Sequence, residues 1–249
     1  MMIRSLRIGW LVCVSLISLP STSVFAQRDE QLWLDYQLSY PFANRYLLEN
    51  TTTYQTLLNK DGKWRSISIS PTFEYTLFRK LDLLSEIPMG YTKQYEGIST
   101  FEITPMVGAR YYFTPAKRID ARFVWRYQVR AFREIEEKDW DISNRTRLRG
   151  EIFISINGPN LFTDNLWYAF LDYEEFIVLD EQLDERYANR RRVRIGLGYR
   201  LDYKNRFELS YTLQSSRDEI ADEFYSNDNV IQLRYKMYLN PARPAQIDE

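Results

Sequence analysis

Apolar and polar side chains alternate one by one along most of the chain after Gln31. A period of two is typical of β-strands, because successive side chains of a strand point to opposite faces. Eleven segments have this period, and turn-forming or strongly polar residues separate them. We predict strands at residues 31–42, 45–56, 65–77, 81–92, 99–113, 118–132, 142–156, 166–176, 190–202, 206–215 and 229–239.

Each predicted strand has one apolar face and one polar face. The apolar positions of segment 118–132, for example, are Ile119, Ala121, Phe123, Trp125, Tyr127, Val129 and Ala131. Across the strand interiors this face has no charged residue, although 27% of the chain is charged. A soluble exported β-protein would bury such a face in its centre, whereas a membrane barrel would turn it toward lipid.

Three features favour the membrane barrel. Most predicted strands have ten or more residues, which exceeds the roughly 5–6 of a mean soluble strand and suits the roughly 9–11 of a tilted membrane strand. The polar face has arginines in mid-strand, where a lumen would let them pair with carboxylates. Aromatic side chains also gather near both strand ends on the apolar face, as at a membrane interface: Tyr40, Phe42, Tyr46, Tyr75, Tyr111, Phe113, Trp167 and Tyr199 near one end, Tyr54, Tyr91, Phe101 and Tyr173 near the other.

Short turns and longer polar loops alternate between the strands, which is typical of an antiparallel up-and-down barrel. We therefore predict an all-β transmembrane barrel with short periplasmic turns and longer extracellular loops. Single-chain bacterial barrels normally have an even number of strands. Because we count eleven segments, we expect about 10–12 strands and favour twelve, with ten as the alternative.

The first 26 residues have the features of a cleaved secretory signal peptide. Arg4 and Arg7 precede an apolar stretch from Ile8 to Leu19, and small residues around Ala26 provide a cleavage site. The apolar stretch is too short to suit a membrane-spanning helix. Residues 1–26 are thus interpreted as a signal peptide and 27–249 as the barrel, with 240–249 as a frayed tail. The expected location is the outer membrane of a Gram-negative bacterium.

Composition excludes several kinds of chemistry. The chain has no histidine, and its one cysteine, Cys13, lies in the predicted signal peptide. The mature protein therefore has no disulfide, no metal site made of His or Cys, and no imidazole base for catalysis. A net charge of −1 gives no basic field for nucleic acid. We expect no cofactor and no enzymatic activity.

Residues 190–214 resemble the signature of an uncharacterised outer-membrane family, the domain of unknown function numbered twenty-four ninety. The similar residues are Arg192, Arg194, Gly196, Gly198 and Tyr199, then, after a turn, Glu208, Ser210, Tyr211 and Gln214. The strand that contains Trp33, the run Tyr173–Phe176 and the last strand, Asn229–Tyr238, are similar too. The resemblance implies a barrel fold and an outer-membrane location, and it supplies no activity.

The polar face is where a functional site is expected. Acids predominate on the first five predicted strands, and arginines on the sixth, seventh and ninth. The resulting hypothesis is a narrow passive channel for small polar or anionic solutes, with opposite charges on two walls of the lumen. Its predicted lining residues are Arg122, Arg126, Arg130, Arg145, Arg147, Arg149, Arg192, Arg194, Arg200, Glu74, Glu86, Glu102, Glu151, Asp172, Glu174 and Glu208.

Three alternatives stay open. Salt bridges could fill the lumen and leave a plugged structural or interaction barrel. A lipid-modifying enzyme would need a base other than histidine, for which Asp172, Glu174 and Glu175 are a candidate carboxylate cluster. The charged loops near 133–141 and 179–186 could contact a partner. Outer-membrane lipid and lipopolysaccharide are the expected partners, and the sequence gives no oligomeric state.

Overall fold

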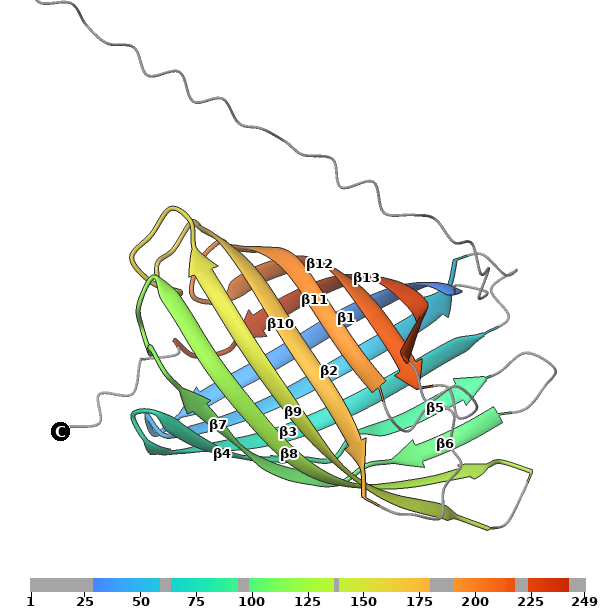
Figure 1. The fold of residues 1–249 in the computed structure, drawn as a ribbon. Coiled ribbons are helices and arrows are strands. Elements are labelled where there is room, and N and C mark those ends of the chain that lie inside the picture. Colours follow the sequence, from blue (N-terminus) through green and yellow to red (C-terminus); the bar gives the residue numbers. More distant parts are fainter. Residues whose placement is uncertain are drawn as a thin grey trace, which may run out of the picture.

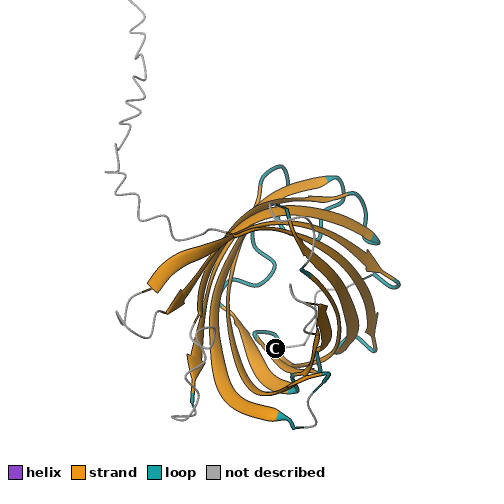
Figure 2. Cartoon of the chain, turned by 90° about the vertical axis from the view of Figure 1, so that its right-hand side faces the viewer, coloured by secondary structure: helices purple, strands orange, loops and turns teal. Residues whose placement is uncertain are grey.

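The structure is a computed structural model, and it describes residues 29–58, 64–93, 99–136, 139–179, 190–217 and 224–241. These residues form one closed β-barrel (Figures 1 and 2). The predicted signal peptide, residues 1–26, and residues 242–249 of the predicted tail lie outside the described residues. Among the described residues, no helix is long and apolar enough to cross a membrane.

Thirteen strand segments make the wall. In two places a pair of segments, β4 with β5 and β6 with β7, forms one interrupted barrel strand, so the wall has eleven barrel strands. The segments are β1 (Asp29–Phe42), β2 (Tyr46–Leu57), β3 (Arg65–Phe78), β4 (Leu81–Glu86), β5 (Met89–Lys93), β6 (Ser99–Ile103), β7 (Met106–Tyr112), β8 (Ile119–Glu134), β9 (Asp141–Ser155), β10 (Leu166–Val178), β11 (Arg190–Arg200), β12 (Asn205–Arg217) and β13 (Phe224–Tyr238).

The barrel closes between its first and last strands, and this closure is parallel. β1 and β13 pair in register from Asp29 opposite Asp228 to Ser39 opposite Tyr238, whereas all other neighbours are antiparallel. A parallel seam permits an odd number of strands. The eleven strands predicted from alternation are therefore the barrel strands of the described chain, and the preference for twelve was wrong. Asp29 and Tyr238 consequently lie at opposite ends of the barrel.

Prolines explain both interruptions, which the alternation pattern did not predict. Proline has no N–H to donate to a ladder, and Pro88 and Pro105 stand where β4–β5 and β6–β7 break. The register continues unchanged through the breaks, with Pro71 on the adjacent β3. Each proline carbonyl still accepts a hydrogen bond from the next strand: Ile87 N to Pro71 O, Thr104 N to Pro88 O and Val129 N to Pro105 O.

The apolar parity faces outward and the charged parity faces inward, as predicted. The outer side chains of Ile195 and Leu209 are 60% and 52% exposed. The inner side chains of Asp172 and Glu174 are only 5% and 4% exposed. An apolar surface of this extent would be strongly unfavourable in water, and it is what a barrel presents to lipid.

Aromatic rings gather on the outer face at the end of the barrel that has the short turns. Neighbouring rings of Tyr40, Phe42, Tyr46 and Tyr75 stack with centroids 5.7, 5.2 and 5.2 Å apart. Trp167 and Tyr199 form a second ring contact at this end, on β10 and β11, with centroids 4.8 Å apart. Such a girdle is typical of the level at which a barrel meets lipid headgroups.

Candidate functional site: the charged lumen

A cavity of about 1380 Å³ occupies the lumen and is lined by residues of both the early and the late strands. Pro41, Ala43, Pro115 and Asn240 line it at the short-turn end. Twelve of the sixteen residues predicted to line a lumen do so: Arg122, Arg126, Arg147, Arg149, Arg192, Arg194, Glu74, Glu86, Glu151, Asp172, Glu174 and Glu208.

The other four predicted residues face inward but lie outside this cavity. Arg130 contacts Glu102 at 2.9 Å, and both lie nearer the long-loop end, as does Arg145, which stacks on Phe176. Arg200 lies at the short-turn end, where it makes hydrogen bonds to the link between β9 and β10. It donates to Leu161 O at 3.0 Å and to Asp164 Oδ1, and so holds the link between β9 and β10 against the barrel mouth.

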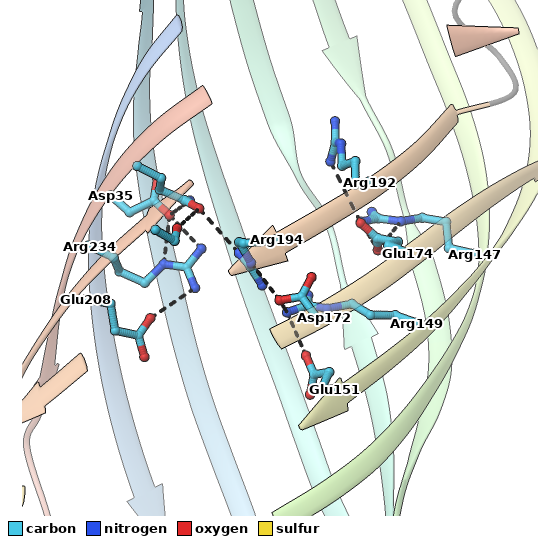
Figure 3. A network of polar contacts seen from close by, with 12 residues as sticks. Asp35, Arg147, Arg149, Glu151, Asp172, Glu174, Arg192, Arg194, Glu208 and Arg234 are labelled. Atoms are coloured by element: carbon cyan, nitrogen blue, oxygen red, sulfur yellow. Dashed lines mark hydrogen bonds and ion pairs between the residues drawn. The ribbon is translucent and has the colours of Figure 1, made fainter. Parts of the chain in front are cut away.

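Two carboxylates of β10 organise the arginines on both sides of them (Figure 3). Glu174 lies between β9 and β11, with Arg147 at 2.5 Å and Arg192 at 3.8 Å. Asp172 has Arg194 at 2.7 Å and Arg149 at 3.6 Å. A charged side chain buried without an opposite charge is costly, so these pairings are what allow the arginine rows to face inward.

Glu151 and Glu208 are neutralised in the same way. Glu151 contacts Arg149 of its own strand at 2.6 Å. Glu208 on β12 contacts Lys236 at 2.7 Å, and it also accepts a 2.6 Å hydrogen bond from the Tyr168 hydroxyl. The Asp172 group joins the closing strands through Gln232, which accepts from Arg194 Nη1 at 3.3 Å and donates to Asp35 at 2.6 Å.

The cavity-lining charges differ between the two halves of the wall. On β1–β7, five carboxylates and one arginine give a net charge of −4: Asp35, Glu49, Glu74, Asp82 and Glu86 with Arg110. On β8–β13, nine cations and five carboxylates give +4: Arg122, Arg126, Arg147, Arg149, Arg192, Arg194, Arg206, Arg234 and Lys236 with Asp120, Glu151, Asp172, Glu174 and Glu208. The acidic and basic walls predicted from sequence are thus present, although carboxylates also lie among the arginines.

The ion pairs run around the wall and not across the cavity. Arg110 contacts Glu74 at 2.8 Å, although the two residues lie two barrel strands apart. The other ion pairs described above join residues of adjacent strands or of the same strand. Across the seam, Arg234 contacts Asp35 of the adjacent strand at 2.7 Å. The opposite charges of the two walls therefore leave space between them for solute.

An apolar cluster lies inside the barrel at the short-turn end, and the alternation of apolar and polar residues did not predict it. Leu166, Tyr168 and Phe170 occupy inner positions of β10, and Leu161 from the preceding link packs on them. Two glycines of β11 make room for the rings. A Cβ at Gly198 would lie 2.2 Å from Tyr168 Cζ, and one at Gly196 would lie 2.3 Å from Phe170 Cζ. In the sequence, the two glycines of the Gly-x-Gly run are the feature that could have predicted large side chains on the neighbouring strand.

Asp172, Glu174 and Glu175, which the sequence suggested as a catalytic carboxylate cluster, do not lie together, so that interpretation was wrong. Asp172 and Glu174 face the lumen, but Glu175 has the opposite parity. Glu175 lies on the outer face and contacts Arg191 at 3.1 Å. Because the barrel wall separates Glu175 from its two neighbours, the three side chains cannot share a substrate or a metal ion.

Comparison with known proteins gives a family and one similar fold. Residues 30–225 match the family described as "Protein of unknown function (DUF2490)". LpxR from Salmonella typhimurium has a similar structure, with a TM-score of 0.48 and 11% sequence identity over 78% of this chain and 83% of that chain. No curated protein sequence matches the chain.

Proposed function

The chain belongs to the DUF2490 family, and we propose that it is an outer-membrane channel that passes small polar solutes, with anions favoured. The outward apolar face and its aromatic girdle support a membrane location. We infer that the short turns face the periplasm and the longer loops the cell exterior, with lipid and lipopolysaccharide around the wall.

One observation carries the channel proposal: charged side chains line a cavity of about 1380 Å³, and they pair along the wall without filling it. Walls of opposite net charge set up a field across the lumen. Such a field orders small polar solutes and water, as in charged constrictions of other pores. In this proposal the barrel is a passive conduit and not an enzyme.

Arginines at the short-turn mouth support a preference for anions. Arg45 and Arg79 lie in turns and line the cavity, and the charges of the strand walls cancel. The described cavity lining therefore has a small positive excess. Long-range attraction at a pore mouth raises the local concentration of the oppositely charged solute.

Planar-bilayer recording tests the proposal. The purified barrel, shown to be folded by its heat-modifiable mobility on a gel, should give discrete current steps, and a salt gradient should give a reversal potential on the anion side. The double substitution Arg45→Gln and Arg79→Gln should move that potential toward the cation side. Lys204→Gln, on an exposed turn outside the cavity, is the matched control.

A plugged interaction barrel is the second candidate, and the link between β9 and β10 favours it. Leu161 is 8% exposed inside the short-turn mouth, and Phe162 lines the cavity beside it. If this link blocks flow, the folded barrel should give no current steps at any salt concentration. A Leu161→Gly, Phe162→Gly variant that then conducts would identify the link as the block, and the channel proposal would be rejected for the native chain.

A further inference from the structure

Arg126 is a lumen arginine whose guanidinium makes no hydrogen bond or ion pair among the described residues. It lines the cavity, and its Nε is buried without a hydrogen bond. Its cross-strand neighbour on β9 is Arg147, another cation, which is already paired with Glu174. Arg126 therefore differs from Arg149 and Arg194, each of which contacts a carboxylate.

Glu86 is the matching acidic case two barrel strands away, across β7. It lines the same cavity at the end of β4, and the described residues give its carboxylate no hydrogen bond or ion pair. The neighbouring acids are satisfied: Glu74 contacts Arg110 at 2.8 Å, and Asp82 accepts a 2.8 Å hydrogen bond from Tyr112. Glu86 and Arg126 are thus an anion and a cation on the cavity wall that make no ion pair among the described residues.

One strand, β7, lies between Glu86 and Arg126, and its glycine gives room to the arginine side chain. In that strand Gly108 lies directly opposite Arg126 in register, and Met106 lies opposite Glu86. A Cβ at Gly108 would be 2.2 Å from the Trp125 carbonyl oxygen and 3.0 Å from Arg126 Cγ. The aliphatic stem of Arg126 therefore lies against the bare backbone of Gly108, which a larger residue would not allow. Arg147 and Glu86 are the charged groups with the strongest electrostatic effect on Arg126.

We propose that Glu86 and Arg126 form a binding site for small zwitterions of the amino-acid type. The proposal rests on the channel function and adds a selection inside the lumen to the preference for anions over cations at the mouth. The anionic group of the solute would lie at Arg126, with Arg147 beside it, and its ammonium group at Glu86. A solute with both charges compensates two half-buried groups, Glu86 and Arg126, of which Arg126 has a buried Nε without a hydrogen bond. A simple anion leaves Glu86 unpaired, and a simple cation leaves Arg126 unpaired.

Three probes of nearly equal size test this site. Alanine carries both charges, lactate has a hydroxyl in place of the ammonium group, and alaninamide has no carboxylate. In proteoliposomes the native barrel should take up alanine at least about tenfold faster than lactate or alaninamide, corresponding to about 1.4 kcal/mol of discrimination. Equal uptake of alanine and lactate would overturn the zwitterion site and leave the channel proposal intact.

Substitutions at the two residues sharpen the test. Glu86→Gln should abolish the preference for alanine over lactate, and Arg126→Gln should abolish the preference over alaninamide. The charge swap Glu86→Arg, Arg126→Glu should restore the preference for alanine, because a zwitterion can bind in the reverse orientation. Lys204→Gln is the control and should leave all three rates unchanged.

Calorimetry separates the site from the channel. Should no probe enter proteoliposomes, the channel proposal fails, and alanine binding to the detergent-solubilised barrel is then decisive. Saturable binding that weakens at least about tenfold in Glu86→Gln supports the site. Absence of binding, or equal binding by the native barrel and Glu86→Gln, rejects it. Heat-modifiable mobility of each variant confirms that the barrel remains folded.

Discussion

The Asp35 carboxylate on β1 accepts a 2.8 Å hydrogen bond from Arg234 Nε on β13, and the same oxygen lies 2.7 Å from Arg234 Nη2 in an ion pair. Gln232 donates to the same oxygen at 2.6 Å. Asp35 and Arg234 are directly opposite in the parallel register, so these buried hydrogen bonds join the two strands that close the barrel. Charge-assisted bonds of this geometry are among the stronger polar contacts in proteins.

Breaking this contact should weaken the whole barrel. Asp35→Asn leaves the Arg234 charge without its main partner, and we expect a loss of about 3 kcal/mol in the free energy of unfolding, measured by urea titration in lipid vesicles. Adding Arg234→Gln should recover part of the loss, because the uncompensated charge is removed. Glu175→Gln, in an outer ion pair, should cost at most about 1 kcal/mol. Equal losses at Asp35 and Glu175 would contradict this account.

Cysteine cross-linking can verify the parallel seam. Leu34 and Leu233 are paired in register on the outer faces of β1 and β13. In a Cys13→Ser background, the pair Leu34→Cys and Leu233→Cys should form a disulfide on oxidation, seen as a mobility change that a reductant reverses. The mismatched pair Leu34→Cys and Met237→Cys is offset by four residues, roughly 13 Å along the strand, and should not. A twelfth strand between β1 and β13 would prevent both.

Glycine at position 198 should be required for packing of the lumen wall. The added methyl group of Gly198→Ala would overlap the Tyr168 ring and displace its hydroxyl from Glu208. Overpacking of this kind should cost about 1–3 kcal/mol of unfolding free energy. Gly150→Ala is the matched control, because its Cβ meets nothing within 4 Å. If both variants unfold at the same urea concentration, the packing explanation fails.

A charge on the outer face should distinguish lipid from water. Ile195 lies mid-strand on β11 and is 60% exposed. In a bilayer, Ile195→Arg should reduce the unfolding free energy by about 2–4 kcal/mol relative to Ile195→Ala, since a cation near the membrane midplane is poorly solvated. An arginine that is neutral or stabilising there would show that this face meets water.

Strict alternation explains why so much of the wall could be predicted from sequence. Segments such as 65–77 and 118–132 match β3 and β8 within two residues, because each position along a barrel strand has only two possible environments. The apolar parity also predicted correctly which side chains face outward, because its mid-strand positions have no charged residue that would meet lipid.

The features that could not be predicted from the sequence depend on which strands are neighbours in the barrel. The number of strands was left at ten to twelve because the pairing of β1 with β13 is a relation between the two ends of the chain. Tyr168 and Phe170 have inner parity but no charge, and only their register with Gly198 and Gly196 explains their place. In the same way, Arg126 differs from the other arginines only because its neighbours in space are Gly108 and Arg147.

The odd strand number has a consequence for how the protein reaches its final state. In an even-stranded barrel the polypeptide enters and leaves the wall on the same side, so neither terminus needs to cross. Here Asp29 and Tyr238 mark entry and exit at opposite mouths. During insertion, one extremity of the polypeptide must therefore be carried through the bilayer, and reporter tags fused ahead of Asp29 and behind Tyr238 would be accessible from different compartments.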